Sequence, residues 1–157
     1  MSDTRWLDAD EQHTWRSFLT ANRLFFDAIE RQLQQDSGLP HAYYEILVRL
    51  SEAKDGRLRM SELAVATQGS RSRLSHAVNR LEQAGWVRRE GIESDRRGQV
   101  AIITEVGLEK LVESAPGHVE EVRRLVFDAL DPRQVGHLRA VAEQILGRVD
   151  PGSSCPS

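Results

Sequence analysis

The chain has 157 residues, of which 39% are hydrophobic and 29% charged, and its formal net charge is -3. This length predicts one domain, and the composition excludes both an intrinsically disordered chain and a strongly basic, histone-like protein. No apolar stretch approaches the roughly 20 residues that a membrane helix needs, and residues 1–10 are too acidic and polar for a signal peptide. We therefore expect a cytoplasmic protein that does not associate with membranes.

The single cysteine, Cys155, lies in a tail rich in Pro, Gly and Ser, residues 151–157, that we expect to be disordered. One cysteine excludes a disulfide within the chain and a multi-cysteine metal site. No basic neighbour would activate its thiol, so redox sensing through Cys155 is not expected. His41, His118 and His137 lack the close spacing of metal ligands, so we expect no metal.

Apolar residues three and four positions apart predict a helix over residues 9–36, which Gly38 and Pro40 end. Its length is more than twice the average of about 11 to 12 residues for helices in globular proteins. We therefore expect this helix to pack against a second copy of the chain.

Shorter elements follow. A helix begins after Pro40, residues 57–59 form an extended bridge, and Ser61 is the expected N-cap of a helix over 62–67. After the turn over residues 68–70, an amphipathic helix spans residues 71–84. It has Ser70 as its N-cap, and its inner face is made of Leu74, Ala77, Val78 and Leu81.

Residues 86–90 and 100–104 predict the two strands of a hairpin, with the polar segment 91–99 as a long tip. Thr104 is the expected N-cap of the next helix, which must kink or break at residues 115–117, where Pro116 stands. Asp131 and Pro132 start a last helix that runs to Val149. The chain is thus predicted to be mainly α-helical with a small β-hairpin.

A short helix, a tight turn and a longer amphipathic helix make a helix-turn-helix, and the hairpin that follows supplies a wing. In this arrangement the first turns of the second helix enter the major groove of DNA. Arginine there can pair with guanine, and serine and histidine can donate to bases or phosphates. The predicted contacts from this helix are Ser70, Arg71, Ser72, Arg73, Ser75, His76 and Arg80.

The distribution of charge favours this hypothesis. Residues 70–97 contain seven arginines and four acids, a local charge of +3 in a chain whose total is -3. Residues 68–80 contain no Asp or Glu, whereas the solvated face of a helix usually mixes both signs.

The predicted wing tip adds Arg96 and Arg97, which suit a minor groove or the sugar-phosphate backbone. Asp95 is predicted to hold a neighbouring arginine by a charge-assisted hydrogen bond and so to fix the loop. For Arg88 and Arg89 two interpretations stay open: an ion pair with Glu82 or Glu90, or a phosphate contact.

At these residues the sequence resembles the MarR family of bacterial winged-helix transcriptional regulators. The family's wing motif is Asp-x-Arg, followed after a short segment by Leu-Thr-x-x-Gly. It stands here as residues 95–107, with Ile103 in place of the leucine. Residues 60–64 and 72–89 are similar to the family's helix-turn-helix and first wing strand.

The resemblance implies a single MarR-like domain over residues 1–150, with a winged helix-turn-helix at 41–104 and dimerisation helices at 9–36 and 105–149. It implies a homodimer on a pseudo-palindromic operator in double-stranded DNA, often as a repressor. It also implies release by a small anionic or phenolic effector, with no other cofactor. Two interpretations stay open for four aromatic residues: they line the effector pocket, or they fill the core. These residues are Trp15, Phe25, Tyr43 and Tyr44.

Two other classes of function agree less well with the sequence. A winged helix that binds protein rather than specific DNA is the alternative, and the concentration of positive charge argues against it. An enzyme has little support, because the sequence has no glycine-rich phosphate loop, no Gly-x-Ser-x-Gly motif and no metal-spaced histidines.

Overall fold

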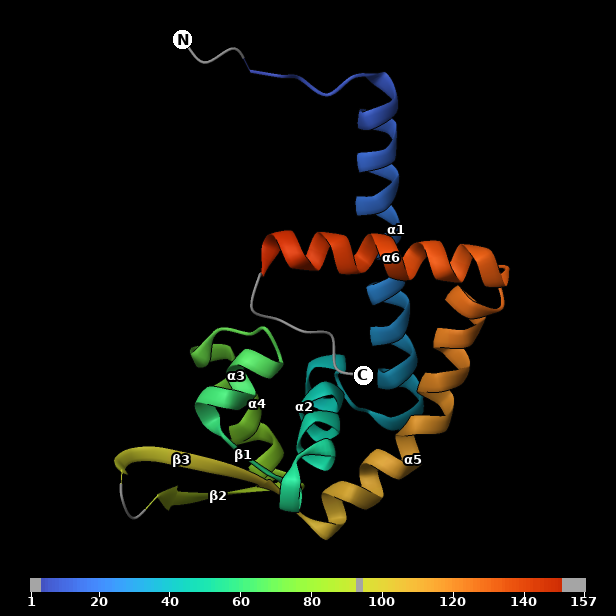
Figure 1. Ribbon diagram of the computed structural model, residues 1–157. Coiled ribbons are helices and arrows are strands. Elements are labelled where there is room, and N and C mark those ends of the chain that lie inside the picture. Colours follow the sequence, from blue (N-terminus) through green and yellow to red (C-terminus); the bar gives the residue numbers. More distant parts are fainter. Residues whose placement is uncertain (1–3, 93–94, 151–157) are drawn as a thin grey trace. The chain divides into compact units, whose positions relative to one another are not determined.

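The computed structural model describes residues 4–92 and 95–150, except for the side chains of residues 96 and 97. The chain forms two compact units, of which the first ends at His118 and the second begins at Val119. The predicted fold class is confirmed, since the chain is mainly helical with one small antiparallel sheet (Figure 1).

Helix α1 (Ala9–Ser37) has the predicted bounds to within one residue. Its start is capped reciprocally: the Asp8 carboxylate accepts from the backbone N–H of Glu11 at 2.8 Å, and the Glu11 carboxylate accepts from that of Asp8 at 3.0 Å. Gly38 ends the helix in the left-handed region, with φ of 62°. Only Ile29 and Leu33 of α1 are buried in the single chain.

The core of the first unit lies where α2 (His41–Glu52), α3 (Met60–Ala66) and α4 (Arg71–Gln83) meet the sheet. A short 3-10 turn, η1 (Lys54–Gly56), joins α2 to the sheet. The aliphatic side chains that are almost wholly buried there are Leu47, Leu50, Leu63, Val78, Leu81 and Val87. The inner face predicted for α4 is among the buried residues in full.

Helix α3 begins two residues earlier than predicted, and Arg59 rather than Ser61 holds its N-cap position. The Glu62 carboxylate accepts a hydrogen bond from the backbone N–H of Arg59 at 3.0 Å. The acceptor of this bond, Glu62, stands in the first turn of α3 and satisfies the backbone N–H of the N-cap residue. The helix can therefore start without a serine at its N-cap. Ser61 therefore lies in the first turn of α3.

The sheet has strand order β1-β3-β2, from β1 (Arg57–Arg59), β2 (Val87–Ile92) and β3 (Asp95–Ile103). The predicted bridge at 57–59 is thus a third strand, and the hairpin is longer than predicted, with its ladder reaching Ile92 and Asp95. The long tip expected over 91–99 is wrong. Backbone hydrogen bonds alone hold an antiparallel ribbon, so polar residues extend the strands where the sequence shows no apolar alternation.

Helix α5 (Glu105–Val122) continues through Pro116, so of the kink or break predicted there, the break does not occur. A proline removes one N–H from the helical ladder, and the bonds on either side suffice to continue the helix. Thr104 caps the start as predicted, because its hydroxyl oxygen accepts from the Gly107 N–H at 3.0 Å. A π-helical turn, η2 (Arg123–Phe127), follows in the second unit.

Helix α6 (Pro132–Val149) starts as predicted, with the Asp131 carboxylate accepting from the backbone N–H groups of Arg133 and Gln134 at 2.8 and 2.9 Å. Within the described chain no residue of α6 is buried. Its apolar residues Leu138, Val141 and Ile145 are 42 to 53% exposed.

Candidate nucleic-acid interface

Helix α4 presents most of the predicted DNA contacts on one exposed face. Its inner residues are buried, so the opposite face projects outward, as the helical period requires. The exposed residues among the predicted contacts are Ser70, Arg71, Ser72, Arg73, His76 and Arg80, while Ser75 is half-buried. These side chains therefore project from one helix and its N-cap, and most of them lie in the first two turns of that helix.

Ser70 has a structural role at the start of this helix. Its hydroxyl oxygen accepts a hydrogen bond from the Arg73 backbone N–H at 3.3 Å, as predicted for an N-cap. The predicted DNA contact by Ser70 stays a prediction, and a contact made through the same oxygen would compete with the cap.

The arginines on α4 are not held by carboxylates. Arg71 and Arg73 form no ion pair with any residue that the structure describes, and Arg80 donates only to the Gln83 side-chain oxygen, at 3.3 Å. With no acid between residues 68 and 80, their full positive charge is available to an anionic partner.

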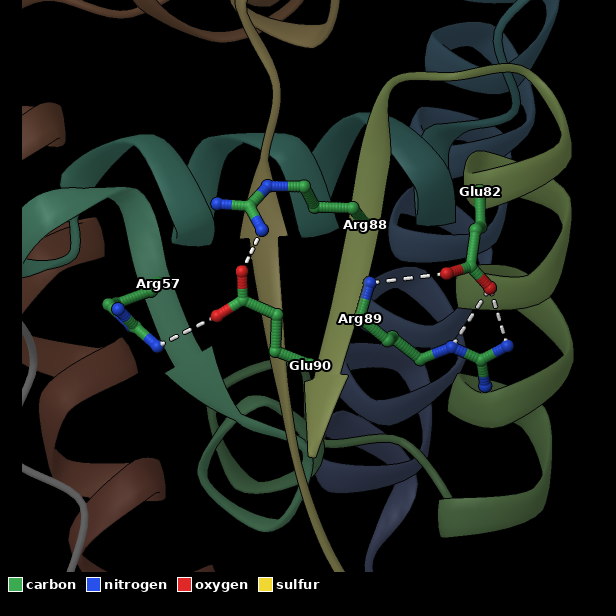
Figure 2. Close-up of polar contacts among 5 residues, drawn as sticks. All are labelled: Arg57, Glu82, Arg88, Arg89 and Glu90. Atoms are coloured by element: carbon green, nitrogen blue, oxygen red, sulfur yellow. Dashed lines mark hydrogen bonds and ion pairs between the residues drawn. The ribbon is translucent and has the colours of Figure 1, made fainter. Parts of the chain in front are cut away.

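The arginines of the sheet behave differently, as Figure 2 shows. Arg89 donates to the Glu82 carboxylate from Nε at 3.0 Å and from Nη2 at 2.6 Å, and its backbone N–H donates to the same group at 3.1 Å. These bonds tie the last turn of α4 to β2. The hydrogen bond from Arg89, opposed in part by desolvation, holds the pKa of Glu82 below its ordinary value.

Glu90 binds the remaining two arginines of this group (Figure 2). It pairs with Arg88 in its own strand and with Arg57 of β1, whose Nη2 lies 3.4 Å from the carboxylate. Of the two interpretations left open for Arg88 and Arg89, the structure therefore shows an ion pair for each.

At the wing, β3 contains the predicted residues Asp95, Arg96 and Arg97. The side chains of Arg96 and Arg97 lie outside the described part of the structure, so their predicted DNA contacts and the predicted pairing with Asp95 stay predictions. The Asp95 side chain lies against Gly98: a Cβ at that position would stand 2.6 Å from Oδ2. Only a glycine leaves room for this close approach.

A groove of about 330 Å³ lies between the start of α4 and the outer half of the wing, where Ile92, Asp95, Gly98 and Gln99 line it. Two of the predicted DNA contacts on α4, Arg71 and Ser75, line it. Arg59 and Ser61 line it too, and sequence reasoning did not include either residue. The signal for Arg59 was the alternating Arg57-Leu58-Arg59, which places two arginines on one face of a strand, whereas no such pattern marks Ser61.

The four aromatic residues predicted for an effector pocket do not share one set of contacts. Trp15 and Phe25 stand ten positions apart on α1, about 15 Å along the axis, and their ring partners are Phe18 and Phe26. Tyr43 is half-buried, whereas Tyr44 is buried and its ring centroid lies 4.5 Å from that of His118. A common pocket of all four stays a prediction.

His118, the last residue of the first unit, is half-buried in an aromatic cluster with Tyr44 and His41. Its Nδ1 is buried and has no hydrogen-bond partner among the described residues. Burial, together with the nearby His41, lowers the pKa of His118 below its ordinary value of 6.5, and burial raises that of Tyr44.

We therefore expect the protein to lose stability as the pH falls below about 6.5 toward the lower pKa of His118. In that range the unfolded chain binds a proton at His118 and the folded chain does not, so the free energy of unfolding decreases. Thermal unfolding between about pH 7.5 and pH 5 measures the effect. His118→Gln should flatten this dependence, and His13→Gln, exposed on α1, should leave it unchanged. The same pH dependence in His118→Gln as in the parent would contradict the expectation.

Within residues 4–92 and 95–150, no three His, Cys, Asp or Glu residues form a group that could hold a metal ion. Cys155 lies outside this range. None of the helices in the described ranges combines the length and the apolar character needed to cross a membrane.

Comparison with known proteins bears on this interface. A family model described as the MarR family matches residues 37–98. Sco3205, a MarR family transcriptional regulator from Streptomyces coelicolor solved in complex with DNA, is 50% identical with a TM-score of 0.92, over 97% of this chain and 95% of that one. AbsC, a MarR family transcriptional regulator from the same organism, is 47% identical with a TM-score of 0.87, over 93% of this chain and 98% of that one.

The chain is also similar to the transcriptional repressor MprA of Escherichia coli K12, with 27% identity over 113 residues. This match covers 72% of the chain and 64% of MprA, which is less than two thirds of that repressor.

Proposed function

The chain belongs to the MarR family of transcriptional regulators, and we propose that it binds double-stranded DNA as a homodimer and represses transcription at the operator that it occupies. In this proposal α4 of each copy reads a major groove, and the wing reaches the backbone or minor groove beside it. The protein then acts by binding rather than by catalysis, and it acts in the cytoplasm, with the chromosome.

One observation supports DNA binding above all others: the contrast between two groups of arginines. Arg71 and Arg73, on the outer face of α4, have no ion pair among the described residues, whereas Arg88 and Arg89 of the sheet are held by glutamates. An unpaired guanidinium can pair bidentately with a guanine edge or a phosphate at no cost in broken ion pairs. The free charges thus lie where a helix-turn-helix meets DNA.

Exposed apolar side chains support the homodimer. In the first unit, α1 leaves Trp15, Phe18 and Phe26 between 45 and 51% exposed. In the second unit, α6 leaves its own apolar residues largely exposed. A helix that shows large apolar residues at three- and four-residue spacing is ordinarily covered by a partner, and a second copy would cover both helices. Two copies of α4 would then lie about 34 to 36 Å apart, one turn of DNA.

We further propose that a small anionic or phenolic effector releases the DNA. The cluster of His41, Tyr44 and His118 in the first unit supports a site for such a molecule, because it joins ring surface to a buried nitrogen that has no hydrogen-bond partner among the residues that the structure describes. Titration of the protein–DNA complex with 2-hydroxybenzoate tests the idea. Release of DNA from the parent but not from a His118→Phe variant supports it, and equal release from both contradicts it.

Competition between duplex DNA and heparin tests the proposed function. A specific DNA-binding protein keeps its labelled duplex in the presence of a modest excess of heparin, and its affinity falls steeply with salt concentration. Sedimentation of the complex should show two chains for each duplex. Equal affinity for heparin and for duplex would favour the alternative, a winged helix that binds a protein and has no specific affinity for DNA.

A further inference from the structure

The groove between α4 and the outer half of the wing has two cationic residues in its lining, beside the apolar Met60, Leu74 and Ile92. They are Arg59, at the junction of β1 and α3, and Arg71, the first residue of α4. Ser61, Ser75 and Gln99 add neutral side chains that can donate hydrogen bonds. Two cations from separate elements thus border one space.

We propose that this groove holds one phosphodiester of the DNA backbone between Arg59 and Arg71, which makes Arg59 a DNA contact that lies before the helix-turn-helix. The inference rests on the proposed function, and it adds a contact that fixes how far α4 enters the major groove. A phosphate held beside the first residue of α4 sets the position of that helix on the duplex, because backbone contacts determine register.

Arg59 has a well-positioned backbone and a side chain that no described carboxylate pairs with. Its backbone pairs with Val100 of β3, and its N–H donates to the Glu62 carboxylate at 3.0 Å. Its side chain is exposed and forms no ion pair with any residue in the described ranges. The backbone is therefore rigid while the guanidinium stays available, which favours a contact with an external anion.

Arg57 provides the contrast within the same strand. It lies two residues earlier, so its side chain leaves the same face of the sheet, but Nη2 lies 3.4 Å from the Glu90 carboxylate, which Arg88 also binds (Figure 2). Of these two arginines of β1, only Arg59 lines the groove. The two residues thus form a matched pair, one at the proposed contact and one away from it.

One acid, Asp95, also borders the groove. Its Oδ2 lies close to Gly98, where a Cβ would stand 2.6 Å from it. Two arginines against one aspartate leave the groove positively charged, which suits the single negative charge of a phosphodiester.

The salt dependence of DNA binding by Arg59→Ala tests the proposal, with Arg57→Ala as its control. Each phosphate contact makes the slope of log affinity against log salt concentration more negative by about 0.9. Losing one contact in each chain of a dimer should therefore make the slope less steep by about 1.8. Affinity should fall about tenfold, equally for an operator duplex and for a scrambled one, because a phosphate carries no sequence. Arg59→Lys should keep the slope, and Arg57→Ala should bind like the parent. Thermal unfolding confirms that each variant is folded.

The outcomes separate the two claims. In one outcome, the affinity of the parent protein for duplex falls steeply with salt concentration and the slope for Arg59→Ala is the same as the parent's. That result overturns the phosphate contact and leaves the proposed function intact. Equal losses of slope in Arg59→Ala and Arg57→Ala also overturn it, since general charge rather than the groove would explain them. A parent that binds no duplex at any salt concentration overturns the proposed function and this contact with it.

Discussion

Replacing Gly107 with alanine is expected to lower the free energy of unfolding by about 3 kcal/mol. A Cβ on Gly107 would stand 2.1 Å from the carbonyl oxygen of Trp86 and 3.0 Å from Cγ1 of Ile103. The first contact is with backbone, which cannot turn aside as a flexible side chain can. The same carbonyl accepts from the Thr104 N–H at 3.0 Å, so a shift large enough to admit the methyl group would also break that hydrogen bond.

Denaturant unfolding of Gly107→Ala beside Gly91→Ala measures this effect. Gly91 lies in β2, and a Cβ there would meet nothing within 4 Å, so the same added methyl group should change stability little. Equal unfolding midpoints for the two variants would show that α5 does not approach the Trp86 backbone as closely as described.

The double substitution of Arg71 and Arg73 by alanine should weaken operator binding by about 100-fold or more, because each lost bidentate contact costs about 1 to 3 kcal/mol. Both side chains are exposed at the first turn of α4 and unpaired among the described residues, so their loss leaves no buried charge behind. Folding should therefore be unaffected. Fluorescence anisotropy with a labelled duplex gives the affinity, and circular dichroism checks the helix content.

Arg88→Ala is the matched control, since it removes an exposed arginine of the same unit that Glu90 already neutralises. We expect its affinity to stay within a few-fold of the parent's. If the variant that lacks both Arg71 and Arg73 bound operator as tightly as Arg88→Ala does, α4 would not be part of the DNA interface.

Much of the fold could be predicted because its signals are local. The cap at Asp131-Pro132, the serine at the start of α4 and the apolar spacing along α1 each specify a helix from a few neighbouring residues. The spacing of Leu74, Val78 and Leu81 likewise predicted which face of α4 is buried. The exposed face follows from the buried one, and so the α4 contacts could be proposed without a structure.

What sequence reasoning missed depends on pairing between distant segments. The sequence predicts an extended segment at residues 57–59, but it does not show that β3 lies beside them and makes them a strand of the sheet. The same pairing brings Arg59 to the groove beside Arg71, twelve positions later in the chain. The roles of Arg88 and Arg89 could not be decided either, since local spacing does not show whether Glu82 and Glu90 come within reach.

Binding of the parent protein to the DNA upstream of its own gene tests the central claim most directly. Anisotropy titrations with that duplex and with a scrambled duplex of equal length, at several salt concentrations, give the specificity ratio and the salt slope together. A sequence-specific regulator should prefer its own duplex by about 1,000-fold or more, with a strongly negative salt slope. Equal, weak and salt-insensitive binding to that duplex, to the scrambled one and to a library of genomic fragments would contradict the account.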